Sequence, residues 1–300
     1  MPWGLEIEPE RLRLCEAEEQ RGQIRILRCG EAALPAGLVR PSLTDSNLPD
    51  PAAVGRLLAD LCRRLKCRGW VGVALPDPSF ALRGIMSDEL PATRGEALRF
   101  LRWQAREFLP FPPDETRLDF LPPIAGVSGQ RRIVCLMGRN SVLAEYEALL
   151  AQAGLQAARL DARIIALAQA ASPGLGTRAA GMLALGQDRL TLLLVEEGRP
   201  RFWRTLGAPD ASTPAGRERL IREIADSLAF ARESEGVATP EELLLDGPDA
   251  GTAPLVPALH EWLELPVRPL DRQSLGLPMN GEPVNLLRWG AAIGAAIGPW

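Results

Sequence analysis

Lysine, histidine and tyrosine are nearly absent from this 300-residue chain, which contains one of each. A phosphate-binding P-loop needs a lysine after a glycine-rich turn, and Lys66 follows no such turn. A Ser/His/Asp or Cys/His catalytic system would have to use His260, which lies in a helical pattern (LVPALHEWLEL) and is interpreted as solvated or capped. No set of four zinc ligands can be assembled. The sequence therefore predicts no catalytic residue and no metal site.

Long apolar runs and paired cysteine motifs are also missing. No stretch approaches the ~20 apolar residues that span a bilayer, and charged residues come too early in the N-terminal segment for a signal peptide. The cysteines are interpreted as buried free thiols of a reducing compartment. They are Cys15, Cys29, Cys62, Cys67 and Cys135. We expect a cytoplasmic protein, unless a partner recruits it to a membrane.

The formal net charge is −4, and the arginines are scattered instead of clustered. Because nucleic-acid binders usually carry a basic surface, we expect no nucleic-acid partner. Hydrophobic residues make up 46% of the chain and charged residues 24%, as in ordinary globular proteins. The length suffices for two domains or one bilobed domain.

The two halves of the chain have the same apolar periodicity. Each predicts a meander of short strands, then helix, strand, helix, strand and helix. In the first half the elements fall at about residues 5–14, 24–26, 51–65, 70–75, 94–108, 133–137, 142–150, 157–160 and 164–171; in the second they fall at 182–185, 190–195, 201–206, 217–234, 243–245, 255–263, 267–269 and 286–297. This alternation predicts an α/β protein with a duplicated plan.

The segment from Leu98 to Phe120, LRFLRWQAREFLPFPPDETRLDF, is the most specific motif. An amphipathic helix runs into a proline-rich stop, an acidic step and a short strand. The segment resembles the "WE.E.yiPFPldEv.lDy" signature of the PilM-like family, actin-like cytoplasmic proteins of type IV pilus assembly. Three flanking segments resemble the same family in the same order: 34–68, 71–76 and 141–168.

The resemblance implies an actin/Hsp70-like fold of two lobes with duplicated mixed sheets, related to FtsA and to the cytoplasmic domain of the type II secretion L protein. The first lobe would span residues 1–176 and carry a small inserted subdomain of the 1C type at about 77–122. A second, trimmed lobe would span 177–300.

The resemblance also places a nucleotide cleft in this chain. Its positions are Gly4, Glu6, Glu8, Ala184, Gly186, Asp246 and Gly247. Glu8 replaces a phosphate-turn glycine and brings a negative charge toward a polyphosphate. Ala184 stands where the second turn has a carboxylate, although Glu6 could in principle replace the aspartate near magnesium. We expect a degenerate cleft, no ATP hydrolysis, weak or absent ATP and magnesium binding, and therefore a pseudo-ATPase.

As partner, the resemblance implies the N-terminal cytoplasmic tail of a PilN-like inner-membrane protein; pilus motor or secretion-platform proteins are further candidates. The tail would lie in a groove between the first lobe and the inserted subdomain. The candidate groove residues are Leu82, Ile85, Leu101, Trp103, Phe108 and Phe111. Phe111→Ala and Leu101→Glu would each weaken tail binding.

Other interpretations stay open. The stretch Val284–Trp289 resembles the partner's own "INLLPW" tail, although we favour the start of a last helix whose GAAIGAAIG packs against the sheet. A nucleotide-binding ATPase or a small-molecule kinase of the same superfamily would need an intact phosphate turn. A filament-forming protein of the FtsA type would usually need a C-terminal amphipathic membrane helix.

Overall fold

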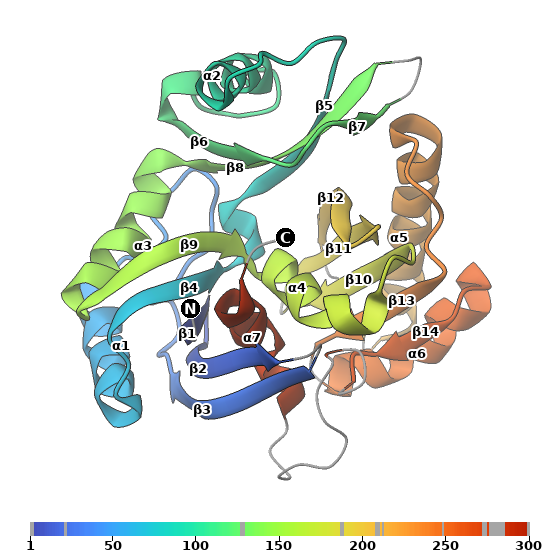
Figure 1. Ribbon diagram of the computed structural model, residues 1–300. Helices are drawn as coiled ribbons and strands as arrows, with labels where there is room; N and C mark the ends of the chain where they lie inside the picture. Colours follow the sequence, from blue (N-terminus) through green and yellow to red (C-terminus); the bar gives the residue numbers. More distant parts are fainter. Residues whose placement is uncertain are drawn as a thin grey trace.

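The computed structural model describes residues 3–20, 23–126, 130–186, 189–207, 211, 213–247, 249–271, 275 and 286–298. Its strands form three sheets, two of five strands and one smaller (Figure 1). The two large sheets lie in separate lobes, and the third covers one end of the molecule.

The first sheet has the strand order β3-β2-β1-β4-β9. These strands are β1 (Trp3–Glu8), β2 (Arg11–Gln20), β3 (Gln23–Ala33), β4 (Gly69–Leu75) and β9 (Leu155–Ala162). The first three form an antiparallel meander, and β4 and β9 add to it in parallel. Helices α1 (Pro51–Leu65) and α3 (Asn140–Gln152) cover one face. A helix described below, α7 (Gly290–Ile297), packs on the sheet as well. Because both faces are covered, β1 is buried over most of its length.

The start and stop of α1 follow from its sequence. The Asp50 side chain accepts a hydrogen bond from the Ala53 amide, 2.9 Å away, and Pro51 occupies the first turn. Lys66 ends the helix in the left-handed conformation, with φ of 59°. The predicted cap is therefore confirmed.

The second sheet repeats this topology in the order β12-β11-β10-β13-β14. Its strands are β10 (Ala180–Leu185), β11 (Arg189–Glu196), β12 (Arg199–Gly207), β13 (Glu242–Asp246) and β14 (Val267–Pro269). Again three antiparallel strands are followed by two parallel ones. Helices α5 (Pro214–Glu235) and α6 (Asp249–Leu263) pack on it and enclose a leucine-rich core. The duplicated plan predicted from the periodicity is thus present.

A subdomain with the third sheet is inserted between β4 and α3. It contains η1 (Asp77–Ser79), β5 (Ala81–Ser87), α2 (Arg94–Ala105), η2 (Pro113–Glu115), β6 (Thr116–Phe120), β7 (Ile124–Ala125) and β8 (Arg131–Arg139). The sequence prediction ended this insertion at about residue 122, whereas its sheet continues to Arg139. The reason is that β8 pairs with β5, β6 and β7 and not with the first sheet. Strand β5 was not predicted at all.

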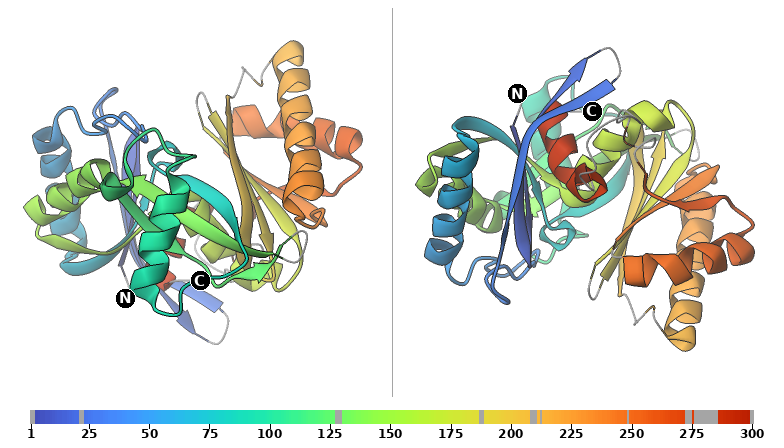
Figure 2. Two further views of the ribbon diagram at one scale, coloured as in Figure 1. Left: turned by 90° about the horizontal axis from the view of Figure 1, so that it is seen from above. Right: turned by 90° about the horizontal axis from the view of Figure 1, so that it is seen from below.

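Two helices join the lobes: α4 (Arg163–Leu175) and α7 (Gly290–Ile297), which follows the short η4 (Leu286–Trp289). Helix α4 packs on β10 and β11 of the second sheet, and α7 packs on β1, β2 and β4 of the first. Figure 2 shows α7, in red, beside the first sheet although it ends the chain. Residues 284 and 285 of the partner-like stretch lie outside the described residues, and α7 confirms the packing helix that we favoured.

Glycines allow this close packing of α7. A Cβ atom on Gly4 would lie 2.6 Å from the Ala296 amide nitrogen, and one on Gly72 would lie 2.9 Å from the Ala295 carbonyl carbon. Gly294 faces the backbone of Ala166 in α4 at a similarly short range. Side chains at these positions would push the helix away from the sheet and from α4.

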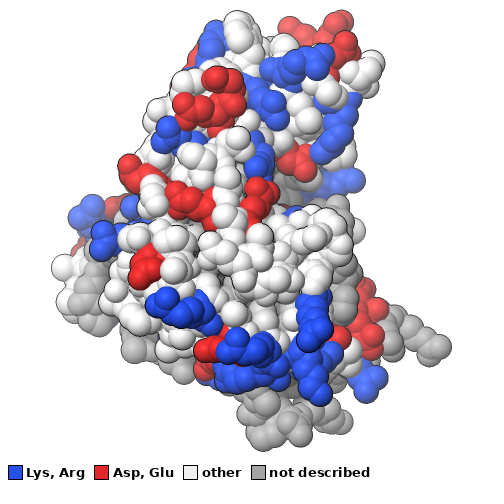
Figure 3. Space-filling model, turned by 90° about the vertical axis from the view of Figure 1, so that its left-hand side faces the viewer, with Lys and Arg blue, Asp and Glu red and all other residues white. Residues whose placement is uncertain are grey.

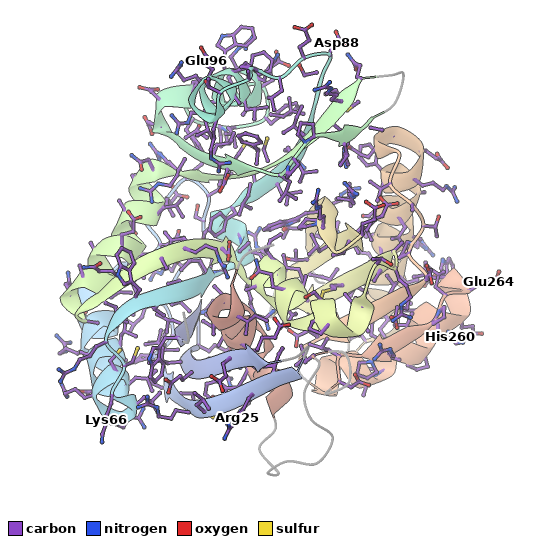
Figure 4. The ribbon with its side chains drawn as sticks, viewed as in Figure 1. Arg25, Lys66, Asp88, Glu96, His260 and Glu264 are labelled. Carbon is purple, nitrogen blue, oxygen red and sulfur yellow. The ribbon has the colours of Figure 1, made fainter. Side chains whose placement is uncertain are left out.

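None of the described helices is long and apolar enough to cross a bilayer. His260 lies on α6 at the outside of the second lobe (Figure 4), and its Nδ1 is 2.7 Å from the carbonyl oxygen of Leu265. This hydrogen bond agrees with the structural role predicted for the residue.

Candidate functional site

The predicted cleft residues lie where the ends of β1, β10 and β13 face one another. Glu6 pairs with Arg13 across the β1–β2 ladder, and Ala184 is beside Asp246 in the second sheet. The Gly186 amide donates to the Arg189 carbonyl, 2.8 Å away, and so closes the β10–β11 hairpin. Gly4 is different, since its missing side chain makes room for α7.

Arg163, the first residue of α4, occupies the centre of this region. Its Nε lies 2.8 Å from Glu6 Oε1 and 3.0 Å from Glu8 Oε1. Its Nη2 lies 2.6 Å from Asp246 Oδ2 in the second lobe. Arg13 Nη1 binds the same two glutamates at 2.9 and 3.0 Å. We call these five side chains (Glu6, Glu8, Arg13, Arg163 and Asp246) the Arg163 network.

Glu6 and Arg13 are buried and the other three side chains of the network are partly buried, so that their charges influence one another. Burial raises the pKa of Glu6 and Glu8 adds to the increase, while Arg163 and Arg13 oppose it. Burial alone would lower the pKa of Arg163, but Glu8, Asp246 and Glu6 hold it well above its usual value. Arg163 therefore stays charged, and the three carboxylates are largely neutralised by two guanidinium groups.

The N-terminus of α4 is also capped. Asp77, from the turn after β4, accepts a hydrogen bond from the Ile164 amide at 2.8 Å and one from the Thr191 side chain of the second lobe. Burial raises the pKa of Asp77 to about 6, although the Ile164 amide, Arg163 and Thr191 oppose the increase. A helix N-terminus can bind phosphate, but here a carboxyl group occupies that position.

These residues fit a magnesium–nucleotide complex poorly. Glu6, Glu8 and Asp246 already bind arginines, and Asp77 would repel a phosphate at α4. No group of three or more acidic, cysteine or histidine side chains suited to a metal ion occurs in the part of the chain that the structure describes. The arrangement joins the two lobes through charged side chains of the protein itself.

The six predicted groove residues do not lie together. Ile85, Leu101 and Phe111 belong to the apolar core of the inserted subdomain, and Leu82 is buried against the first lobe. Trp103 and Phe108 are exposed, with 53% and 48% of their surface accessible. Substitution of Leu101 or Phe111 would therefore disturb the subdomain core itself.

A cavity of about 840 Å³ lies between the inserted subdomain and the second lobe. It is bounded by the edge strands β5 and β12, by the loop 41–44 and by the C-terminal half of α5; we call it the β5–β12 groove. Leu82 and Phe108 line it, whereas Ile85, Leu101, Trp103 and Phe111 do not. The wall from the second lobe was not predicted.

Two phenylalanines face this groove from opposite walls. Phe108 follows α2, and Phe230 lies on α5 with 45% of its surface accessible. The Phe230 ring is 6.1 Å from that of Phe202, which is buried. Arg132 crosses Gly84 and donates to Glu235 at 2.7 and 3.1 Å, so that a further ion pair joins the subdomain to the second lobe.

Sequence reasoning missed Arg13, Arg163, Asp77 and Phe230. Arg13 had a signal, since strand pairing across the β1–β2 turn places it opposite Glu6. No signal in the sequence pointed to Arg163 or Phe230, because their partners are far away along the chain. Their roles depend on how the lobes pack.

Neither a protein-family model nor a curated protein matches the chain. Among solved structures, a chain of the PilM-PilN type IV pilus biogenesis complex is similar over 98% of this chain and 97% of its own length, with a TM-score of 0.80 and 22% identity. The cytoplasmic domain of EpsL, an inner-membrane component of the Vibrio cholerae type II secretion system, is similar over 99% of this chain and 94% of its own length. Its TM-score is 0.53 and its identity is 11%.

A Bacteroides thetaiotaomicron protein with an actin-like ATPase fold and unknown function covers 91% of this chain and 93% of its own, with a TM-score of 0.53 and 9% identity. At these identities the similarities show the fold. The chain has the two-lobed actin-like fold, and the predicted resemblance to PilM-like proteins is confirmed at that level.

Proposed function

We propose that this protein is a non-catalytic scaffold of a type IV pilus or related secretion assembly platform, and that it binds the cytoplasmic tail of a PilN-like membrane protein. The similarity to the PilM-PilN chain over nearly the whole length is the observation that carries the proposal. The similarity to the EpsL domain points to the same class of machine.

The β5–β12 groove is the best place for such a tail. It is bounded by the edge strands of two different sheets. Edge strands offer unpaired backbone groups to an extended peptide, and apolar side chains nearby give specificity. Phe108 and Phe230 provide those apolar surfaces. Membrane association would come through the tail.

The Arg163 network supports the proposal that nucleotide is dispensable. Arg163 neutralises the carboxylates that a magnesium ion would need and joins the lobes directly. An ATPase or kinase of this superfamily would need those groups for its substrate. We infer a cleft that neither binds nor hydrolyses ATP.

Calorimetric titration of the protein with the PilN-like tail peptide of the same host, with and without Mg-ATP, tests the proposal. We expect saturable one-to-one binding that Mg-ATP does not change. Binding that requires Mg-ATP would reverse the conclusion about the cleft, and no binding under either condition would overturn the scaffold function.

The variant Phe108→Ala tests whether the tail binds in the β5–β12 groove. Because well-packed aromatic anchors dominate such contacts, the variant should weaken tail binding about tenfold or more. Trp103→Ala is the matched control, since Trp103 is equally exposed on the same subdomain but does not line the groove. Equal loss in both variants, or loss only in the control, would place the tail elsewhere.

A further inference from the structure

Two cysteines meet at the C-terminal end of α1. Lys66 takes the left-handed conformation there, and its amide donates to the Arg63 carbonyl at 3.3 Å. The Cys67 amide donates to the Cys62 carbonyl at 3.0 Å. These two hydrogen bonds define a Schellman motif, in which the side chains of the first and last residues are commonly in contact. In this protein those residues are Cys62 and Cys67, so that the cap brings together two thiols that the sequence separates.

The two thiols lie just below the surface and contact each other. Each cysteine has 4% of its surface accessible. A hydrogen bond between the thiols lowers the pKa of Cys62, although burial opposes the change. The same hydrogen bond raises the pKa of Cys67, where burial acts in the same direction. Cys62 is therefore the thiol that ionises first, with Cys67 as its donor, and the thiolate is the reactive form of a cysteine.

The surroundings of this pair are basic. Exposed cations flank it along the chain, namely Arg63, Arg64, Lys66 and Arg68. Arg28 on β3 also donates to the last carbonyl of α1, 2.8 Å away. Figure 3 shows the face that carries α1, and basic side chains gather at its lower end with few acidic ones among them. Such positive charge stabilises a thiolate and attracts an anionic reagent.

We propose that Cys62 and Cys67 form an oxidisable dithiol site that reacts with an anionic small-molecule disulfide of the glutathione class. The Cys62 thiolate attacks one sulfur atom of the disulfide, whose S–S bond breaks. The other half leaves as a thiolate and takes up the proton that Cys62 lost. Cys67 then gives its proton to the second leaving thiolate as its sulfur attacks that of Cys62. Two protein thiols are thereby oxidised to one disulfide, and the small disulfide is reduced to two thiols.

A second cysteine pair provides a comparison within the same lobe. Cys15 and Cys29 are direct neighbours across the β2–β3 ladder, and we call them the cross-strand pair. Burial raises the pKa of both thiols, and Cys15 is fully buried. Because a thiol that stays protonated reacts slowly, we expect the cross-strand pair to remain reduced while Cys62 and Cys67 are oxidised. Both pairs lie away from the β5–β12 groove, so that the proposal does not depend on tail binding.

Oxidation of the full chain with glutathione disulfide, followed by alkylation of the remaining thiols and tryptic mass mapping, tests the proposal. Trypsin cleaves at the basic residues between the two cysteines, so that a Cys62–Cys67 disulfide links peptide 57–63 to dipeptide 67–68. We expect this linked product, with the cross-strand pair alkylated. The variant C15S/C29S should be oxidised at the wild-type rate. A disulfide in the cross-strand pair alone, or no disulfide at all, would overturn the proposal.

Two single variants separate the roles of the thiols. Cys67→Ser has no second thiol to release the glutathione, so that it should accumulate a mixed disulfide on Cys62, seen as the added mass of one glutathione. Cys62→Ser should form such an adduct at least about tenfold more slowly, because the remaining thiol is the one that keeps its proton. Circular dichroism checks that both variants fold. Equal adduct formation in the two variants would show two independent thiols and contradict the proposed order of attack.

Charge reversal tests the preference for an anionic disulfide. K66E/R68E should slow oxidation by glutathione disulfide about threefold or more at low salt, because the basic surroundings no longer attract its carboxylates. Oxidation by the uncharged hydroxyethyl disulfide should keep its rate. The matched control R99E/R204E makes the same change of net charge at exposed arginines of α2 and β12 and should leave both rates unchanged. Equal slowing in both double variants, or with both disulfides, would overturn the assigned class of reagent.

Discussion

At the scale of single residues, Arg163 is the central side chain: it begins α4, and it contacts carboxylates of both lobes. Positive charge at a helix N-terminus is unfavourable, and burial adds to its cost. Three carboxylates within 3.0 Å outweigh both effects. Without it, Asp246 would lose its partner in the network, and Glu6 and Glu8 would share Arg13 alone.

Arg163→Met should lower the free energy of unfolding by about 3–5 kcal/mol, because it leaves Asp246 without its partner in the network and leaves Glu6 and Glu8 with Arg13 alone. Urea denaturation measures the change. Arg219→Met is the control: the Arg219–Glu223 pair is 3.0 Å long but lies on the exposed face of α5, and such pairs contribute about 0.3–0.5 kcal/mol. Equal midpoints for wild type and Arg163→Met would show that the network contributes nothing to stability.

The raised pKa of Asp77 predicts that the stability of the protein depends on pH. Its pKa in the folded protein is about 6 against an ordinary value of 3.8. The folded state therefore binds the proton more tightly than the unfolded state, so that this group stabilises the fold below pH 4 and loses that contribution as the pH rises through 6. A shift of about 2 units corresponds to roughly 3 kcal/mol.

Asp77→Asn cannot ionise and can still accept the hydrogen bond from Ile164. Its stability relative to wild type should therefore rise by roughly 3 kcal/mol between pH 4 and pH 7. Urea midpoints at four pH values would show the trend, with Asp88→Asn on the exposed end of the insertion as control. A difference that stays constant over this range would contradict the raised pKa.

At the scale of elements, α7 has the most demanding packing. Its residues are small and nearly all buried; its own Gly294 allows contact with α4, and Gly4 and Gly72 of the first sheet allow contact with that sheet. Arg159 also donates to the carbonyls of Gly294 and Ala295, both at 3.3 Å. This helix ties α4 to the first sheet because its backbone can approach both neighbours closely.

Gly294→Ala should destabilise the protein by about 1–3 kcal/mol or more, because the added methyl group would lie 2.6 Å from the Ala166 carbonyl carbon. Differential scanning calorimetry would report a lower Tm. Gly95→Ala, on the exposed first turn of α2, has open space around the new methyl group and should leave the Tm unchanged or slightly higher. An unchanged Tm for Gly294→Ala would mean that α4 and α7 can separate without cost.

Element boundaries were predicted well where the local sequence decides them. The α1 cap at Asp50 and the strand Val267–Pro269 agree with the structure. Strand β5 was missed because its pairing partner, β8, lies more than 40 residues further along the chain, with α2 in between. The predicted helix from 94 to 108 ends earlier, at Ala105, since the chain must turn toward the prolines that follow.

At the scale of the whole molecule, one hydrophobic cluster spans both lobes, beside the separate core of the second lobe. The cluster that contains the first sheet and both central helices extends to Met182, Leu193, Trp203 and Leu244 of the second sheet. Three polar links add to it: Arg163 with Asp246, Arg132 with Glu235, and Asp77 with Thr191. These contacts between side chains of the protein hold the lobes together.

Mg-ATP should change neither the Tm nor the radius of gyration from small-angle X-ray scattering. Ligand at 100 times its Kd would stabilise the protein by about 2.7 kcal/mol, which a thermal scan detects readily. A rise of several degrees, or a smaller radius, would show that nucleotide enters the cleft and moves the lobes. Mg-GTP is a suitable control for specificity.

The sequence by itself determined the α/β class, the duplication, the cap of α1 and the packing role of the last helix, because short-range periodicity and local hydrogen bonds decide these features. It also indicated that Glu6, Glu8 and Asp246 belong to one cleft. Only the tertiary structure decided that Arg163 neutralises them, and that Phe108 meets Phe230 across a groove while Leu101 is buried. These contacts join residues from different lobes or sheets, whose distance depends on how the layers pack and not on local sequence.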